Sequence, residues 1–292
     1  MRRLVSRMPC GRYRLMNYLA DRCSTRTFRS HFMVSKKKMY FDCDLNDSIR
    51  REVCFTGLYE PLETSLVKQI LGPGKTFVDV GANWGYFTLI ASVLVGEQGS
   101  VIALEPEPGL FSALDVNVRH NELKNVTVLK VAASNTKGEA SFTGSNPKSG
   151  NSGLNRLVAN SERSEGVVAE TDRLDDLLNA RGVTEVSLMK MDIEGAEGLA
   201  MEGSSELLES HRIKVLLLEL HPGLLKTHGH SAQSVVDRLI ASGYRGYRIP
   251  HDQSSLRSTY YSRVELNVEA LQPIHHFDDQ DLWPHYLFRV DP

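Results

Sequence analysis

A short apolar run that passes through a glycine turn into an apolar helix constrains the fold of this chain more than any other feature. The stretch is FVDVGANWGYF at residues 77–87, and it contains Asp79, Gly81 and Gly85. The run TFVDV at its start is too short for a helix and rich in β-branched residues, so it predicts a buried strand. Glycines four positions apart permit a tight turn before the helix. The stretch therefore predicts a strand–turn–helix unit with a carboxylate near the end of its strand.

Strands and helices alternate along most of the chain. The apolar patterns predict strands at residues 38–44, 76–80, 100–105, 126–133, 138–144, 186–192, 214–220, 244–249 and 285–290. The run VVAETDRLDDLLNARG predicts a further short strand and then a helix from about Leu174. The other predicted segments are two helices broken near Gly57 and Pro61, helices at 84–95, 110–120, 196–209 and 231–242, and polar, irregular segments at 145–157 and 250–284. This alternation predicts an α/β protein with a mainly parallel sheet and helices on both faces, in which ligands bind outside the carboxyl ends of the strands.

The composition is that of a soluble globular protein, because 41% of the 292 residues are hydrophobic and 24% are charged. The sequence contains no run near the roughly 18 apolar residues that a membrane span needs, and its start lacks the apolar stretch of a secretory signal. Its four cysteines, Cys10, Cys23, Cys43 and Cys54, form no C-x-x-C pair. We therefore expect a cytoplasmic protein with reduced thiols and no cysteine-bound zinc.

The N-terminal part of the chain is strongly basic. Residues 1–38 contain eleven Lys or Arg residues and one acid, Asp21, so this segment carries a charge of +10 in a chain whose net charge is −2. We predict a basic arm and cap at residues 1–56, followed by the main domain at residues 57–292. The arm is expected to be a solvated helical appendage, a contact for an anionic membrane or anionic substrate, a transit peptide or a nucleic-acid contact.

Four of the five predicted parallel strands end in a carboxylate, namely Asp79, Glu105, Asp192 and Glu219. Burying several carboxylates beside one crevice is costly unless a ligand uses them. A crevice with this negative lining suits a ligand that carries hydroxyls and a positive centre. It suits a pyrophosphate poorly.

The glycine turn also differs from the fingerprint of a dinucleotide site. That fingerprint reads G-x-G-x-x-G, whereas this chain reads D-x-G-x-x-x-G, with Asn83 in place of the second glycine. Glu105 lies 20 residues beyond Gly85, the usual distance for an acid that accepts hydrogen bonds from ribose hydroxyls. A ribose without phosphates, next to an amino acid and a sulfonium, describes S-adenosylmethionine. A nicotinamide oxidoreductase is the alternative that this spacing disfavours.

Four motifs occur in order between residues 77 and 222, namely FVDVGANWGYFTLIAS, VIALEPEPGLFSALDVNVRHN, LMKMDIEGAE and LLLELHP. Together with GLYEPLETSLVKQILGPGKTF upstream, they resemble the FkbM-type methyltransferases over about residues 36–222. The resemblance implies a Rossmann-like class I methyltransferase sandwich with antiparallel closing strands and a small N-terminal appendage. It also implies an S-adenosylmethionine-dependent O-methyltransferase that acts on a hydroxyl of a sugar, glycolipid or secondary metabolite.

The resemblance implies roles for individual residues. Gly81 and Gly85 would form the turn that admits the methionine part of the cofactor, and Asp79 and Asn83 would order that turn or hold the ammonium. Glu105, followed by Pro106, would accept hydrogen bonds from the ribose hydroxyls, and the segment at Ala132 would lie beside the adenine. Asp192 and Glu194 would face the methyl group or its acceptor. Glu219 and His221 lie two apart after the fifth strand, so on extended backbone they share one face.

Methyl transfer to a hydroxyl needs the acceptor oxygen in line with the methyl group, and a base that takes the proton helps. Asp192 and His221 are the candidate bases, and the sequence does not separate them. Asp192, Glu219 and His221 could instead bind a divalent cation that acidifies the hydroxyl, but their spacing is no dedicated metal motif and we assign no metal ligand. A nucleic-acid methyltransferase and a non-catalytic membrane-surface protein on the same fold stay open. Nucleic acid is disfavoured because the chain lacks a basic surface interleaved with aromatic residues.

Overall fold

The computed structural model describes residues 5, 12–142, 167–251, 266, 268–277 and 284–290. The predicted irregular segment 145–157, most of segment 250–284 and nearly all of the first eleven residues of the basic arm lie outside the described residues. Within the described ranges, no helix combines the length and the apolarity that crossing a bilayer requires.

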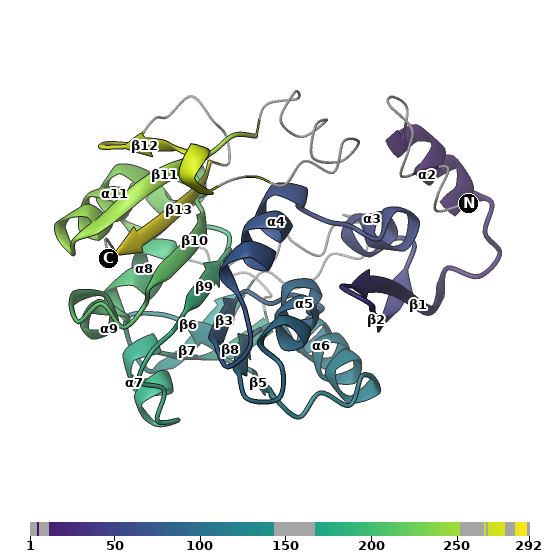
Figure 1. Ribbon diagram of the computed structural model, residues 1–292, viewed down its shortest axis with the longest axis horizontal. Coiled ribbons are helices and arrows are strands. Elements are labelled where there is room, and N and C mark those ends of the chain that lie inside the picture. The colour runs from purple at the N-terminus through teal and green to yellow at the C-terminus, as the bar shows by residue number, and fades with distance from the viewer. Residues whose placement is uncertain are drawn as a thin grey trace.

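An eight-stranded sheet with the order β12-β11-β13-β10-β9-β3-β4-β5 forms the centre of the molecule (Figure 1). Its strands are β3 (Thr76–Val80), β4 (Ser100–Leu104), β5 (Val126–Leu129), β9 (Leu188–Met191), β10 (Val215–Glu219), β11 (Tyr244–Ile249), β12 (Gln272–Ile274) and β13 (His285–Val290). The pairs from β10 through β9, β3 and β4 to β5 are parallel, whereas β13 pairs antiparallel with both β10 and β11. The predicted mainly parallel sheet with antiparallel closing strands is therefore confirmed. Strand β12 corrects the prediction that segment 250–284 is irregular throughout.

Helices cover both faces of this sheet (Figure 1). The helical segments are α2 (Arg12–Asp21), α3 (Ser48–Thr56), α4 (Pro61–Ile70), α5 (Tyr86–Val95), α6 (Pro108–His120), α7 (Leu174–Asn179), α8 (Glu197–Glu202), α9 (Ser205–Glu209), α10 (Pro222–Leu225) and α11 (Ala232–Ala241), with the short 3₁₀ turns η3 (Lys226–His228) and η4 (Val268–Ala270). One hydrophobic cluster joins α4 and α5 to Phe77 and Leu188, and another joins α7, α8, α9 and α11 to Val78 and Met189. Neighbouring strand residues belong to different clusters because successive side chains point to opposite faces of the sheet.

The predicted single strand at residues 126–133 is wrong. Strand β5 ends at Leu129, and the chain then leaves the main sheet to form β6 (Ala132–Ala133). Together with β7 (Gly138–Phe142) and β8 (Val167–Asp172), β6 forms a second sheet with the order β6-β8-β7. Ala132 pairs with Thr171 in this sheet, so a partner distant in sequence decides where β5 stops and fixes the position of Ala132.

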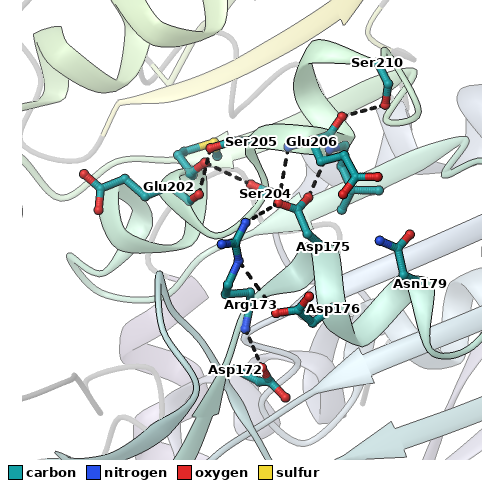
Figure 2. Close-up of polar contacts among 12 residues, drawn as sticks. Asp172, Arg173, Asp175, Asp176, Asn179, Glu202, Ser204, Ser205, Glu206 and Ser210 are labelled. Carbon is teal, nitrogen blue, oxygen red and sulfur yellow. Dashed lines mark hydrogen bonds and ion pairs between the residues drawn. The ribbon is translucent and has the colours of Figure 1, made fainter.

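The predicted single helix at residues 196–209 is two helices, α8 and α9, with a break at Gly203. A Cβ on Gly203 would lie 1.9 Å from the carbonyl oxygen of Ser134. Figure 2 shows Asp175 at the start of α9, where it accepts hydrogen bonds from the backbone N–H groups of Glu206 at 3.2 Å and Leu207 at 3.0 Å. Arg173 donates to the same carboxylate at 2.9 Å. A side chain from another element therefore caps a second helix start, which local apolar spacing does not reveal.

The N-terminal appendage contains α2, α3 and a hairpin of β1 (Thr27–Val34) and β2 (Lys37–Asp44). It lies beside α6 at one side of the molecule (Figure 1). Strand β1 falls inside the predicted basic arm and was not predicted from the sequence. Phe41 of the hairpin stacks on Trp84 with ring centroids 4.9 Å apart, and Phe32 lies 5.2 Å from the ring of Tyr86. The predicted small appendage is confirmed, while the boundary between residues 56 and 57 stays a prediction.

Candidate active site

A pocket of about 240 Å³ lies at the carboxyl ends of β3, β4, β9 and β10. Ten of the eleven predicted site residues line it, which are Asp79, Gly81, Asn83, Glu105, Pro106, Ala132, Asp192, Glu194, Glu219 and His221. Gly85 does not line it. Parallel strands bring their carboxyl ends to one edge of the sheet, which explains why motifs far apart in sequence converge here.

The two turn glycines have different structural roles. Gly81 has a φ of +85°, and a Cβ there would lie 2.0 Å from the carbonyl oxygen of Asp192. Its backbone N–H donates to the carbonyl of Leu104 at 3.0 Å, which ties the turn to β4. Gly85 has a φ of +98°, and a Cβ there would lie 2.6 Å from Leu114 of α6. Gly81 thus shapes the pocket, whereas Gly85 lets α5 start close to α6.

Glu105 is held by the glycine turn and by the chain that follows it. The backbone N–H of Asn83 donates to its Oε2 at 2.8 Å, and that of Glu107 donates to its Oε1 at 3.0 Å. Burial raises the pKa of Glu105 to about 7, although these two hydrogen bonds act in the opposite direction. A carboxylate has about four lone-pair sites, so both oxygens keep the capacity to accept hydrogen bonds from the hydroxyls of a ribose.

Asp79 connects β3 to α5. The hydroxyl of Thr88 donates to its Oδ2 at 2.6 Å, and the residue is only 2% exposed. Burial raises the pKa of Asp79 to about 6. On the sheet, Asp79 pairs in register with Lys190 of β9, so an ammonium lies beside this carboxylate. The side chain therefore orders the strand–turn–helix unit, as one of its two predicted roles requires.

Lys190 is a pocket residue that the sequence analysis missed. It lies within the apolar strand β9 and is 5% exposed, with its Nζ 3.3 Å from Asp192 Oδ2 and 3.7 Å from Glu60 Oε2. Its Nζ also lies 4.8 Å from the ring centroid of Phe87. Burial alone would lower the pKa of Lys190, but the charges of Glu60 and Asp192 outweigh it and raise that pKa. A lysine inside the run LMKM, two positions before Asp192 on the same strand face, was the available signal.

Asp192 is ionised at neutral pH. Burial acts to raise the pKa of its carboxyl, but the positive charges of Lys190 and His221 outweigh burial and hold it below its ordinary value. Its side chain is 24% exposed, so it faces the open part of the pocket. Asp192 is therefore a fixed negative charge that a ligand can reach.

His221 is enclosed by three carboxylates. Its Nδ1 lies 3.1 Å from Glu197 Oε1, and its Nε2 lies 3.3 Å from Glu194 Oε2 and 3.5 Å from Glu219 Oε1. Burial acts to lower the pKa of His221, but the hydrogen bond to Glu197 and the charge of Asp192 outweigh it and raise that pKa to about 9. Glu197 is fully buried and was missed as a partner of His221, because an acid in the first turn of a helix is common without any further role.

The pKa of Glu219 shifts in the opposite direction from that of Asp192. Burial, together with the charges of Asp192 and Glu60, raises the pKa of Glu219 well above its ordinary value. The ligand atoms of Asp192, Glu219 and His221 lie within 4.8 Å of one another. A divalent cation held by these three residues was an alternative from the sequence, which assigns no metal ligand, and it stays that alternative.

Comparisons with known proteins show which family has these features. The family model described as "Methyltransferase FkbM domain" matches residues 79–249. The 31-O-demethyl-FK506 methyltransferase FkbM of Streptomyces tacrolimicus is 28% identical over 207 residues, which cover 59% of this chain and 78% of that protein. The hexuronic acid methyltransferase AglP of Haloferax volcanii is 28% identical over 146 residues, which cover 50% of this chain and 56% of that protein. The solved structure of the methyltransferase FkbM of Methylobacillus flagellatus is 14% identical, with a TM-score of 0.44, covering 82% of this chain and 52% of that one.

Proposed function

Because this chain belongs to the FkbM methyltransferase family and uses S-adenosylmethionine as its methyl donor, we propose that it methylates a hydroxyl oxygen of a sugar, glycolipid or secondary metabolite. The cofactor supplies a methyl group on a positively charged sulfonium. The residues of the chain then have to hold the cofactor, place the acceptor oxygen in line with the methyl group and accept a proton.

The end of the pocket formed by β3 and β4 fits the cofactor. Glu105 would accept hydrogen bonds from the ribose hydroxyls, since both of its oxygens retain lone pairs beyond the bonds from Asn83 and Glu107. Gly81 keeps the turn free of a side chain beside Asp192. Ala132 lines the same pocket with a small side chain and would border the adenine. The carboxylates around this space favour a ligand with a sulfonium and an ammonium over one with phosphates.

The position of Asp192 in the pocket is the observation that carries the proposal for a hydroxyl acceptor. Its side chain is 24% exposed and lies 3.3 Å from the Lys190 ammonium, so its carboxylate can accept a hydrogen bond from an acceptor hydroxyl and take up the proton as the methyl group is transferred. His221 is the weaker candidate, because a pKa of about 9 leaves it protonated at neutral pH. We therefore assign the proton acceptor to Asp192 and give His221 the role of a positively charged neighbour that keeps Asp192 ionised.

Two further observations favour this acceptor class. The names of the relatives from Streptomyces tacrolimicus and Haloferax volcanii give a 31-O-demethyl-FK506 and a hexuronic acid as the molecules that those enzymes methylate. In the pocket, Trp84 and Tyr86 are 1% and 4% exposed, because they pack against Phe41 and Phe32 of the hairpin. Neither ring offers a face for stacking on a nucleobase, which disfavours the nucleic-acid alternative.

A radiolabelled methyl-transfer assay on a panel of hydroxylated glycans, glycolipids and polyketides tests the proposal. We expect one acceptor class to gain label on oxygen, and the deoxy analogue of that acceptor to gain none. The variant Asp192→Asn should lose about 10²- to 10⁴-fold in turnover while it still binds S-adenosylmethionine. The matched control is Asp237→Asn on the exposed face of α11, which should keep full turnover. Label on nitrogen or carbon, or wild-type turnover in Asp192→Asn, would contradict the proposal.

A further inference from the structure

A second group of ionisable side chains, two of them buried and one partly buried, lies next to the pocket and has no part in the function proposed above. Glu63 of α4, His251 after β11 and His285 of β13 come together from three elements. Glu63 Oε1 lies 2.6 Å from His251 Nε2 and 3.0 Å from His285 Nδ1. The two imidazole rings stack with centroids 3.8 Å apart and an interplanar angle of 17°. We call these three residues the His–His–Glu cluster.

The His–His–Glu cluster lowers the stability of the fold if its ionisable groups hold only protons. Glu63 is fully buried, and its Oε2 has no hydrogen-bond partner among the described residues. A buried carboxylate oxygen without a hydrogen-bond partner destabilises the fold. Both imidazoles face the other oxygen of the same carboxylate, so protonating both would place two like charges in stacked rings. A divalent cation would replace these protons with one ion shared by all three side chains.

We propose that Glu63, His251 and His285 bind a divalent transition-metal ion, and that Zn²⁺ is the ion that fits best. Two imidazole nitrogens and one carboxylate oxygen are a ligand set that favours zinc or iron over magnesium or calcium. The three ligand atoms lie within 4.8 Å of one another. Tetrahedral Zn²⁺ with bonds of about 2.0–2.1 Å needs ligand atoms about 3.4 Å apart. To admit the ion, the two Glu63 contacts would therefore lengthen by less than about 1 Å, and the two stacked rings would rotate apart so that both nitrogens point at it.

The second nitrogen of His285 supports the same assignment. Histidines that bind a metal usually donate their other ring N–H to a carboxylate, which fixes the tautomer and the ring orientation. Here His285 Nδ1 faces Glu63, while Nε2 lies 3.5 Å from Glu219 Oε1. Glu219 also lines the methyl-transfer pocket and lies 3.5 Å from His221. The ion would therefore fix α4, the end of β11 and β13 at the edge of the pocket, and it would position Glu219 through His285.

This site is separate from a cation held by Asp192, Glu219 and His221, because it shares no ligand with that set. It also does not depend on the methyl acceptor. Metal binding can be measured without any turnover, so a negative result here would leave the proposed methyl transfer untouched.

The test uses the full chain without a polyhistidine tag, stripped with a chelator and titrated with Zn²⁺ against a chromophoric competitor. We expect one tightly bound Zn²⁺ per chain. The variants His251→Ala, His285→Ala and Glu63→Gln should each weaken binding by more than about 100-fold, since even changes outside the ligand set cost 10- to 100-fold. The matched control is the double change His275→Asn with His276→Asn, which removes two neighbouring exposed histidines and should leave the tight site intact.

Cobalt substitution of the unmodified chain keeps the test decisive if a variant fails to fold. Co²⁺ in a site with these three ligands should give an intense visible absorption that Zn²⁺ displaces. The conservative variant Glu219→Gln should keep this absorption but bind Zn²⁺ 10- to 100-fold more weakly. The proposal is overturned if the wild-type chain shows no such band, or if it binds Zn²⁺ no more tightly than His285→Ala does. It is also overturned if the His275 and His276 control abolishes binding.

Discussion

At the scale of single residues, neighbouring charges shift the pKa values of two pocket carboxyls in opposite directions. Asp192 is next to Lys190, and this ammonium holds its pKa low. Glu219 is also buried near Lys190, but the charges of Asp192 and Glu60 act against its ionisation and raise its pKa. Of these two carboxyls, Asp192 is therefore the one whose neighbours favour the ionised form.

The raised pKa of Glu105 predicts that cofactor binding depends on pH. In the free chain this pKa is about 7, above the ordinary 4.5, because the carboxyl is buried. Ribose hydroxyls donate to the ionised form, so binding lowers the pKa and releases a proton below pH 7. Affinity should therefore rise with pH up to about 7 and then level off, with a slope of at most about tenfold per pH unit. Calorimetric titration with S-adenosylmethionine between pH 5.5 and 8 measures this slope.

The variant Glu105→Gln provides the control for that titration. Its side chain does not titrate, so its affinity should be lower than that of the wild type and nearly independent of pH from 5.5 to 7. Any pH dependence that belongs to the cofactor itself appears in both proteins. Equal slopes in the two proteins would show that Glu105 does not contact the ribose.

Lys190→Met is expected to destabilise the chain strongly. The change would leave the Glu60 carboxylate, 11% exposed, without its ammonium partner and would remove one of the positive neighbours of Asp192, and breaking a buried ion pair from one side costs about 3–5 kcal/mol. The matched control is Lys214→Met, which removes an exposed ion pair with Glu185, since the Lys214 side chain is 46% exposed. This control should change the free energy of unfolding by less than about 1 kcal/mol. Urea unfolding measures both. A similar small loss in both variants would rule out Lys190 as the main counter-charge of the pocket.

At the scale of elements, the sequence was sufficient wherever the signal was local. Asp79 and Gly81 lie within one strand–turn–helix unit, and Glu105 follows that unit at a characteristic spacing along the chain. The structure places Asp79, Gly81 and Glu105 in one pocket. The same holds for Asp192 and His221, because Asp192 directly follows β9 and His221 lies two residues after the end of β10.

The failures share a physical cause, which is a partner that lies far away in sequence. The strand predicted at residues 126–133 ends early because Ala132 pairs with Thr171. The helix predicted at residues 196–209 breaks because Asp175 caps the start of α9. Lys190 was missed as a pocket residue because one of its counter-charges, Glu60, lies 130 positions earlier in the sequence.

Gly81→Ala should damage the pocket far more than an equivalent change in an open loop. A Cβ on Gly81 would meet the backbone carbonyl of Asp192 at 2.0 Å, and a backbone atom cannot rotate away. We expect a loss of about 3 kcal/mol or more and no thermal shift with S-adenosylmethionine. Gly74→Ala is the matched control, because Gly74 has a φ of +80° but nothing within 4 Å of a Cβ. It should cost only about 1–2 kcal/mol for the left-handed backbone.

The comparison between these two glycine variants separates two effects. Both carry the strain of a positive φ, and only Gly81→Ala adds the clash. If urea unfolding gave equal losses and both variants kept the thermal shift, the close approach of the turn to Asp192 would not matter for cofactor binding.

At the scale of the whole molecule, the N-terminal appendage is joined to the methyltransferase core by aromatic packing. Phe32 and Phe41 belong to the same hydrophobic cluster as Trp84 and Tyr86, which follow the glycine turn. The alternating pattern of residues 38–44 predicted a strand with one buried face, but a period of two does not reveal which surface covers that face. Contact of the basic residues with an anionic membrane stays a prediction.

Phe41→Ala tests whether the appendage and the core form one cooperative unit. Phe41 is 1% exposed and stacks on Trp84, so truncation should cost about 3–5 kcal/mol. The neighbouring Tyr40 points to the opposite face of β2 and is 40% exposed, so Tyr40→Ala should cost less than about 1 kcal/mol. With one cooperative unit, far-ultraviolet circular dichroism and tryptophan fluorescence should report the same shifted urea midpoint. Two separate transitions in Phe41→Ala, with the larger one at the wild-type midpoint, would instead show that the appendage unfolds independently and would support a domain boundary near residue 56.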